Sequence, residues 1–123
     1  MGEDMANKPR ELVHVELHTA DPEAARALYG SLCGWQAETV HARGRPYLAL
    51  EPGRGLGGGI VGCSSERPIW LPYVEVPSVT LATESARQLG ATVLLEPREG
   101  PTGWRSVVST PAGGEIAFWR AKR

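Results

Sequence analysis

Three ionisable side chains alternate along one predicted strand near the start of the chain. In the segment 11–18, His14, Glu16 and His18 occupy every second position, and apolar residues lie between them. This period of two predicts a strand with one polar and one apolar face. Imidazole and carboxylate groups can ligate a metal, transfer protons or hold a ligand by hydrogen bonds. Side chains four residues apart on a strand lie roughly 13 Å apart, so the two histidines are not expected to share one ion.

Three interpretations of this polar face stay open. His14 and Glu16 could hold a metal together with a residue from another strand. The pair could instead line a pocket, where it would serve acid–base chemistry or ligand binding. The remaining interpretation is a structural pair that is satisfied by its own hydrogen bonds.

A second strand repeats this arrangement further along the chain. Over the segment 69–76, Leu71, Tyr73 and Glu75 share one face, and valines lie on the other. If both polar faces line one cleft, Glu16 and Glu75 approach it from equivalent positions. Burial raises the pKa of a carboxyl group, so either glutamate is a candidate general base. The alternative for Glu75 is an exposed position at the rim of the cleft.

A helix with clear end signals follows each of these strands. Asp21 is the predicted N-cap before Pro22, and Gly34 is the predicted C-cap. The second helical pattern covers residues 79–89 and ends at Gly90. The apolar stripes predicted to face the sheet consist of Ala24, Ala25, Leu28, Tyr29 and Leu32 in the first helix, and Val79, Ala82, Ala86 and Leu89 in the second.

The order of elements occurs twice. Three strand candidates follow each helix, at 35–41, 46–51 and 56–62 and again at 92–96, 104–109 and 115–120. The chain therefore has the pattern of an α+β fold, in which two βαβββ modules form a cupped, half-barrel mixed sheet around a cleft. The predicted boundaries are a disordered leader over 1–10 and a single domain over 11–123, with modules at 11–63 and 69–121 and a linker at 64–68.

Composition limits the classes of partner. The 123 residues carry a formal net charge of -1, which argues against nucleic-acid binding because that function needs a basic surface. No apolar run approaches the ~20 residues that span a bilayer, and the polar N-terminus is unlike a signal peptide. We expect a cytoplasmic protein that binds neither nucleic acid nor membrane. The two cysteines are then reduced, and Cys33 is expected to be a small buried apolar residue.

The tryptophans and a glycine run allow further expectations. Trp119 shares a strand phase with Ala117, so we expect both to face the cleft, where an aromatic ring suits a planar or apolar ligand. Trp35 and Trp70 begin strands, and for these two residues core or interface packing is expected at least as much as a role in the pocket. The glycine-rich segment 53–59 has no strand-to-helix context and no Gly-Lys-Ser/Thr, so we interpret it as a tight turn into a close-packed strand.

The order and spacing of several segments resemble the vicinal oxygen chelate superfamily, in its glyoxalase-like branch. This superfamily includes glyoxalase I, extradiol dioxygenases and bleomycin-resistance proteins. The matching segments are 14–22, 25–29, 32–35, 56–60, 73–76, 89–93 and 110–114. Members of the family are commonly dimers, so the resemblance implies a homodimer.

The resemblance also implies where a metal would be held. Metal-bearing members use four equivalent strand positions, of which this chain has His14, Leu71 and Ala117, and no ligand side chain on the strand at 56–62. One of the four positions can therefore ligate a metal, whereas a catalytic metal site needs about three protein ligands. We predict no family-type metal site and no cofactor, with a divalent metal at His14 as the alternative.

The function that we expect is metal-independent binding of a small aromatic or apolar organic molecule in the cleft. The protein would sequester this molecule or serve small-molecule metabolism as an accessory protein. The alternative is an isomerase, lyase or hydroxylase-like enzyme that uses Glu16, His14 or Glu75 as a general base, or a degenerate divalent metal site. A purely structural or interaction dimer is the third hypothesis. The predicted ligand-binding residues are His14, Glu16, His18, Leu71, Tyr73, Glu75, Ala117 and Trp119.

Overall fold

Two helices and eight strands make up the fold in a computed structural model that describes residues 9–42, 45–63, 68–100 and 102–122. The elements are β1 (Leu12–Thr19), α2 (Pro22–Cys33), β2 (Glu38–Ala42), β3 (Arg45–Gly53), β4 (Leu56–Gly62), β5 (Ile69–Glu75), α3 (Val79–Gln88), β6 (Thr92–Glu99), β7 (Gly103–Ser109) and β8 (Glu115–Ala121). Most of the predicted leader and linker lies outside the described residues.

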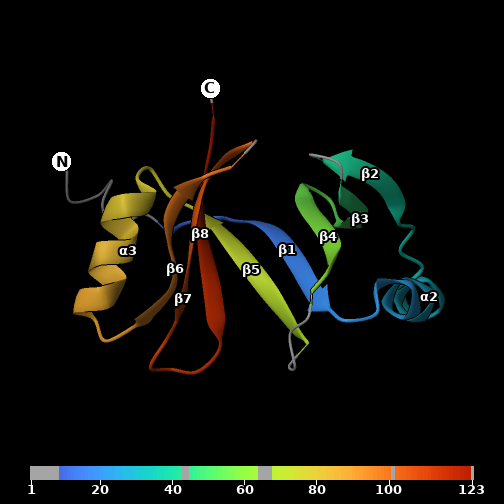
Figure 1. The fold of residues 1–123 in the computed structure, drawn as a ribbon, viewed down its shortest axis with the longest axis horizontal. Coiled ribbons are helices and arrows are strands. Elements are labelled where there is room, and N and C mark those ends of the chain that lie inside the picture. Colours follow the sequence, from blue (N-terminus) through green and yellow to red (C-terminus); the bar gives the residue numbers. More distant parts are fainter. Residues whose placement is uncertain (1–8, 43–44, 64–67, 101, 123) are drawn as a thin grey trace. The chain divides into compact units, whose positions relative to one another are not determined.

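The element order confirms the expected α+β fold of two βαβββ modules. The first module runs from β1 through α2 to β4, and the second runs from β5 through α3 to β8 (Figure 1). The chain forms two compact units, and β5 begins in one and ends in the other. We call Val13–Tyr73 the β1–β4 unit. The described residues up to Leu12 and from Val74 onward form the β6–β8 unit.

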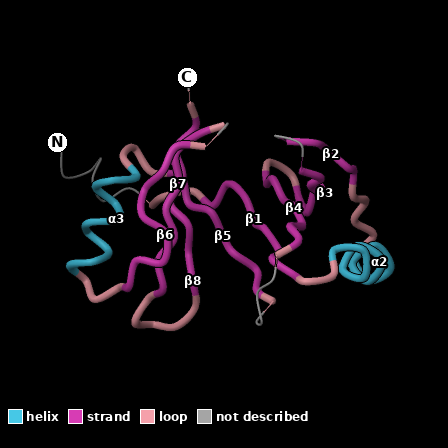
Figure 2. Tube along the Cα trace, in the orientation of Figure 1, coloured by secondary structure: helices cyan, strands magenta, loops and turns pink. Residues whose placement is uncertain are grey.

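The β1–β4 unit contains a mixed sheet. Its strands lie in the order β2-β3-β4-β1-β5. β2 and β3 pair antiparallel, as do β3 and β4, whereas β1 pairs with β4 in parallel. A parallel neighbour requires a crossover connection, and the run from α2 through β3 provides it (Figure 2).

The core of this unit lies on the face of β1 opposite to its histidines. Leu17, Leu48, Leu50 and Ile60 form a buried cluster, with Ala25, Tyr29, Trp35, Ala37 and Trp70 packed against it. Three of these side chains form an aromatic group. Tyr29 stacks on Trp35 with ring centroids 5.7 Å apart, and the Nε1–H of Trp70 donates to the Tyr29 hydroxyl at 3.2 Å. Trp35 and Trp70 therefore have the packing role that was one of their two expected roles.

Helix α2 begins and ends where its sequence predicts. The Asp21 carboxylate accepts from the Ala24 N–H at 3.0 Å, and Gly34 has the left-handed φ of 72°. The predicted stripe is only partly correct, because Leu28 and Leu32 are 55% and 70% exposed. The expectation for the cysteine at the helix end was wrong, since Cys33 is exposed.

The β6–β8 unit pairs its three strands antiparallel, in the order β8-β7-β6. Helix α3 packs on these strands, and its Thr83 hydroxyl contacts the Ser106 hydroxyl of β7 at 2.7 Å. Val79 is buried as expected, whereas Leu89 is 81% exposed and the stripe includes Thr83 in its place. Within the described ranges, neither helix is long and apolar enough to cross a membrane.

Candidate functional site

A hydrogen-bonded network surrounds one carboxylate on β1. Glu16 Oε1 lies 2.9 Å from His18 Nε2 and accepts from the Tyr73 hydroxyl at 3.0 Å. Glu16 Oε2 lies 3.4 Å from His14 Nε2. The structure thus brings together four of the residues predicted to bind a ligand.

Strand geometry explains why both histidines reach the same carboxylate. Residues at i-2 and i+2 lie on the same strand face as residue i, so His14 and His18 flank Glu16. Each imidazole turns its Nε2 toward the central carboxylate, although the two Cα atoms are four residues apart. From the spacing of the strand we expected that the two histidines would not share one metal ion. That argument did not consider that both histidines could bond to the carboxylate between them.

Glycines on β4 make room for this network. The register places Gly57 beside His14 and Gly59 beside Glu16. A Cβ on Gly57 would come within 2.9 Å of His14 Nδ1, and a Cβ on Gly59 would overlap the Tyr47 ring. The Tyr47 hydroxyl reaches over this strand to His14 Nε2 at 3.3 Å and to the Gly58 carbonyl at 3.4 Å.

Electrostatics keep the central carboxylate ionised. Burial alone would raise the pKa of Glu16, but hydrogen bonds from His14, His18 and Tyr73 outweigh burial and lower the pKa from 4.5 to about 2. The raised pKa expected for a buried general base is therefore not found at this residue. Burial, together with the negative charge of Glu16, raises the pKa of Tyr47, which stays a neutral hydroxyl at neutral pH.

The other predicted ligand-binding residues have different surroundings. Leu71, in the β1–β4 unit, is 2% exposed and leaves little surface for a ligand. In the β6–β8 unit, Ala117 is fully buried, Glu75 is exposed, and the half-buried Trp119 has its ring over Gly103.

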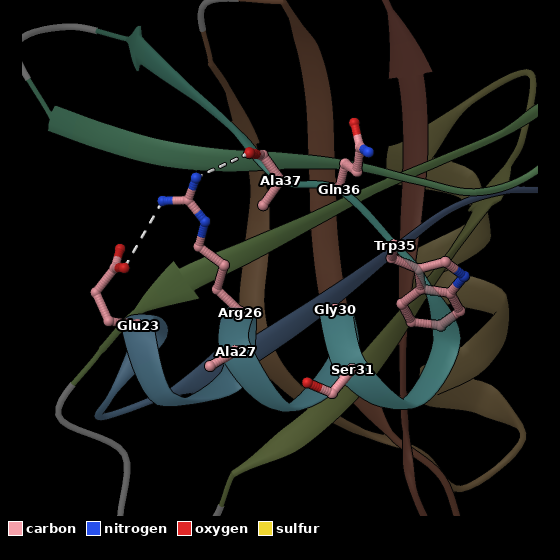
Figure 3. A pocket seen from close by; sticks show the side chains of 8 residues that line it. All are labelled: Glu23, Arg26, Ala27, Gly30, Ser31, Trp35, Gln36 and Ala37. Carbon is pink, nitrogen blue, oxygen red and sulfur yellow. Dashed lines mark hydrogen bonds and ion pairs between the residues drawn. The ribbon is translucent and has the colours of Figure 1, made fainter.

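An open hollow of about 570 Å³ lies elsewhere on the β1–β4 unit, beside helix α2. Figure 3 shows the ring of Trp35 and the guanidinium of Arg26 among the side chains around it. The Arg26 guanidinium donates to the Ala37 carbonyl at 3.3 Å and lies 3.7 Å from the Glu23 carboxylate. The groups that line this hollow are not those of the Glu16 network.

Sequence reasoning missed Tyr47. This residue lies in the strand candidate at 46–51, and its own neighbours carry no motif. The available signal was the glycine run on β4, where residues without side chains allow another strand's ring to lie across the sheet. We interpreted that run as a turn into a close-packed strand, which is correct for the backbone but does not identify the ring that packs there.

Comparisons with known proteins identify the fold. No family model matches the chain, and no curated protein matches it. A hypothetical protein from Bacillus halodurans is similar in structure over 94% of this chain and 97% of its own, with a TM-score of 0.69 and 14% identity. Methylmalonyl-CoA epimerase from Mycobacterium tuberculosis matches over 91% of this chain and 88% of its own, with a TM-score of 0.64 and 17% identity. The chain has the vicinal oxygen chelate fold.

A second epimerase structure, which contains a bound ligand, is also similar to this chain. A variant of methylmalonyl-CoA epimerase from Streptomyces coelicolor, in complex with 2-nitronate-propionyl-CoA, covers 94% of this chain and 100% of its own. The TM-score is 0.63 and the identity is 15%. At such identities the likeness establishes the fold alone.

The donor set of this chain does not fit the metal that the vicinal oxygen chelate fold implies. Of the expected positions, His14 has a ligand atom, whereas Leu71 and Ala117 have none. Both oxygens of Glu16 are already bonded within the protein. Across the ranges that the structure describes, no group of three or more His, Cys, Asp or Glu side chains is placed to hold a metal ion.

Proposed function

We propose that the face formed by His14, Glu16, His18 and Tyr47 binds a small aromatic or apolar organic molecule without a metal. The observation that carries the proposal is that both carboxylate oxygens of Glu16 accept hydrogen bonds from side chains of this chain. The carboxylate receives three such hydrogen bonds, which leaves it little capacity to ligate a metal. Its pKa of about 2 also makes it a weak base at neutral pH.

The surroundings of the carboxylate suit ligand binding. The side chains of His14 and His18 are 26% and 25% exposed, so each imidazole keeps an open edge. The ring of the buried Tyr73 meets the ring of His14 edge-on at 5.1 Å and supports this imidazole from within the fold. Apolar walls with a few placed polar groups are typical of small-molecule sites. A protein of this kind would sequester its ligand or act as an accessory protein.

Several expectations from the sequence complete the proposal. The protein is proposed to be a cytoplasmic homodimer with no nucleic-acid or membrane partner. Leu71 in the β1–β4 unit, and Glu75, Ala117 and Trp119 in the β6–β8 unit, stay predicted ligand-binding residues.

Metal analysis of freshly purified protein tests the proposal. Wild type, His14→Ala and His41→Ala are compared after titration with zinc, nickel and manganese, because His41 is an exposed histidine on β2 of the same unit. We expect substoichiometric metal in all three. Stoichiometric metal that is lost in His14→Ala and kept in His41→Ala would overturn metal independence and favour a degenerate divalent metal site.

A second candidate function is supported by the 2.9 Å contact between Glu16 and His18. A carboxylate that orients an imidazole is the arrangement of a histidine general base. This chain could then be an isomerase, lyase or hydroxylase-like enzyme, with His18 or His14 rather than Glu16 as the base. Incorporation of deuterium from heavy water into a bound carbon acid would support this function, and loss of incorporation in His18→Gln would assign the base.

A further inference from the structure

We infer that this face selects ligands that donate hydrogen bonds, such as phenols, over ligands that only accept them or that carry a negative charge. The inference rests on the proposed function, since it names the chemical class that the same site would take. It follows from the positions of the protons around Glu16.

The carboxylate of Glu16 dictates where its neighbours carry their protons. An ionised carboxylate only accepts hydrogen bonds, so Tyr73 and both imidazoles must donate to it. In a neutral imidazole one nitrogen donates and the other accepts. In their neutral form, His14 and His18 are therefore held with the proton on Nε2.

The hydroxyl of Tyr47 completes the same pattern. It lies 3.3 Å from His14 Nε2, whose proton is directed toward Glu16 and this hydroxyl. The Tyr47 hydroxyl is then free to donate to the Gly58 carbonyl at 3.4 Å. Each donor proton of the network is thereby used within the protein.

Two acceptors are left for a ligand, namely the Nδ1 atoms of His14 and His18. Neither has a hydrogen-bond partner among the described residues. Every buried side-chain nitrogen or oxygen in those ranges has a hydrogen-bond partner. The two Nδ1 atoms have none, so they are not buried and are open to solvent. Gly57 keeps the Nδ1 of His14 uncovered, because any larger residue would place its Cβ against that atom.

Charge adds to the same preference. When both imidazoles are in their neutral form, Glu16 carries the single full charge among the five side chains of the network. An anionic ligand would meet this charge in a half-buried setting, where screening by water is weak. A neutral ligand with an O–H or N–H group meets lone pairs and no repulsion.

The substitution Glu16→Gln should reverse the pattern at one histidine. A glutamine amide offers one acceptor and one donor. Its oxygen can replace Oε1 opposite Tyr73 and His18, and its NH₂ group then faces His14 Nε2. His14 must accept there, so its proton moves to Nδ1 and the open edge becomes a donor.

Nitrogen-15 NMR of the imidazoles reads these protons directly, with or without a ligand. We expect the Nε2–H form for His14 and His18 in the wild type, and the Nδ1–H form for His14 in Glu16→Gln. His41, on β2 and outside the network, provides a reference that should not change between the two proteins. If His14 or His18 of the wild type carries its proton on Nδ1, the inference is wrong, and the proposed function is unaffected.

Binding of three matched probes tests the selection itself. Phenol donates a hydrogen bond, anisole has a similar shape without the donor, and benzoate is an anion. We expect phenol to bind the wild type about three- to tenfold more tightly than anisole, the effect of one net hydrogen bond. Benzoate should bind most weakly.

The double variant His14→Gln/His18→Gln is the sharpest control. A glutamine amide can still donate to Glu16 in place of Nε2–H, and its remaining acceptor, Oε1, does not occupy the Nδ1 position. We expect phenol to lose its advantage over anisole in this variant and to keep it in His41→Gln. Equal binding of phenol and anisole to the wild type overturns the inference alone, whereas absence of binding by every probe overturns the proposed function with it.

Discussion

Replacement of Glu16 by Gln should remove a large part of the acid sensitivity of this protein. The pKa of Glu16 is lowered from 4.5 to about 2, because three hydrogen bonds outweigh the effect of burial, and the side chain is 11% exposed. This difference corresponds to about 3 kcal/mol of folding free energy at neutral pH. Folding lowers the pKa, so this stability is present above about pH 4.5 and is lost as the pH falls toward about 2. By about pH 3 the wild type should have lost about 2 kcal/mol.

Urea unfolding at a series of pH values, followed by circular dichroism, measures this loss. Glu38→Gln is the matched control, because Glu38 is an exposed glutamate on β2 of the same unit. The wild type and Glu38→Gln should lose stability in parallel between about pH 5 and about pH 3, and Glu16→Gln should show a flatter profile. If the stability of Glu16→Gln falls as steeply with pH as that of the wild type, the hydrogen bonds of the network are not what lowers the pKa of Glu16.

Two further predictions concern packing and exposure. Gly59→Ala should destabilise the protein by about 1–3 kcal/mol in urea unfolding, because its Cβ overlaps the Tyr47 ring, whereas Gly53→Ala, with open space around it, should be nearly neutral. Equal stability of the two variants would contradict the position of Tyr47 over β4. Under native conditions a thiol reagent should modify the exposed Cys33 faster than the half-buried Cys63, and the reverse order would contradict the exposed end of α2.

Some of the fold could be predicted from the sequence because its signals are local. The capping residues Asp21 and Gly34 act on neighbouring backbone groups, so the ends of α2 follow from a few adjacent residues. Alternation along β1 likewise assigns His14, Glu16 and His18 to one face without any knowledge of other strands. The repeated order of elements then identified the two modules and the fold class.

The errors lie where packing partners matter. The predicted stripe on α2 correctly included Ala25 and Tyr29, which pack against the core, but it also included Leu28 and Leu32, which are exposed. A periodic pattern indicates that a helix is amphipathic, but its neighbours decide which part of the apolar arc is covered. Cys33 was assigned to the core because free cysteines are commonly buried, and the structure shows it exposed at the end of α2.

The candidate site shows most clearly which properties follow from local sequence signals and which depend on packing partners. By itself, the sequence determined that three ionisable side chains share a strand face and that few metal ligands occupy the family's positions. The chemistry of these side chains depends on the folded arrangement, because Tyr47 from β3 and Tyr73 from β5 complete the network across strands distant in sequence. The pKa of Glu16 depends on hydrogen bonds whose geometry includes such long-range partners, so the expected rise became a fall. Periodicity assigns a residue to a face, whereas its protonation depends on which groups the fold places within hydrogen-bond distance.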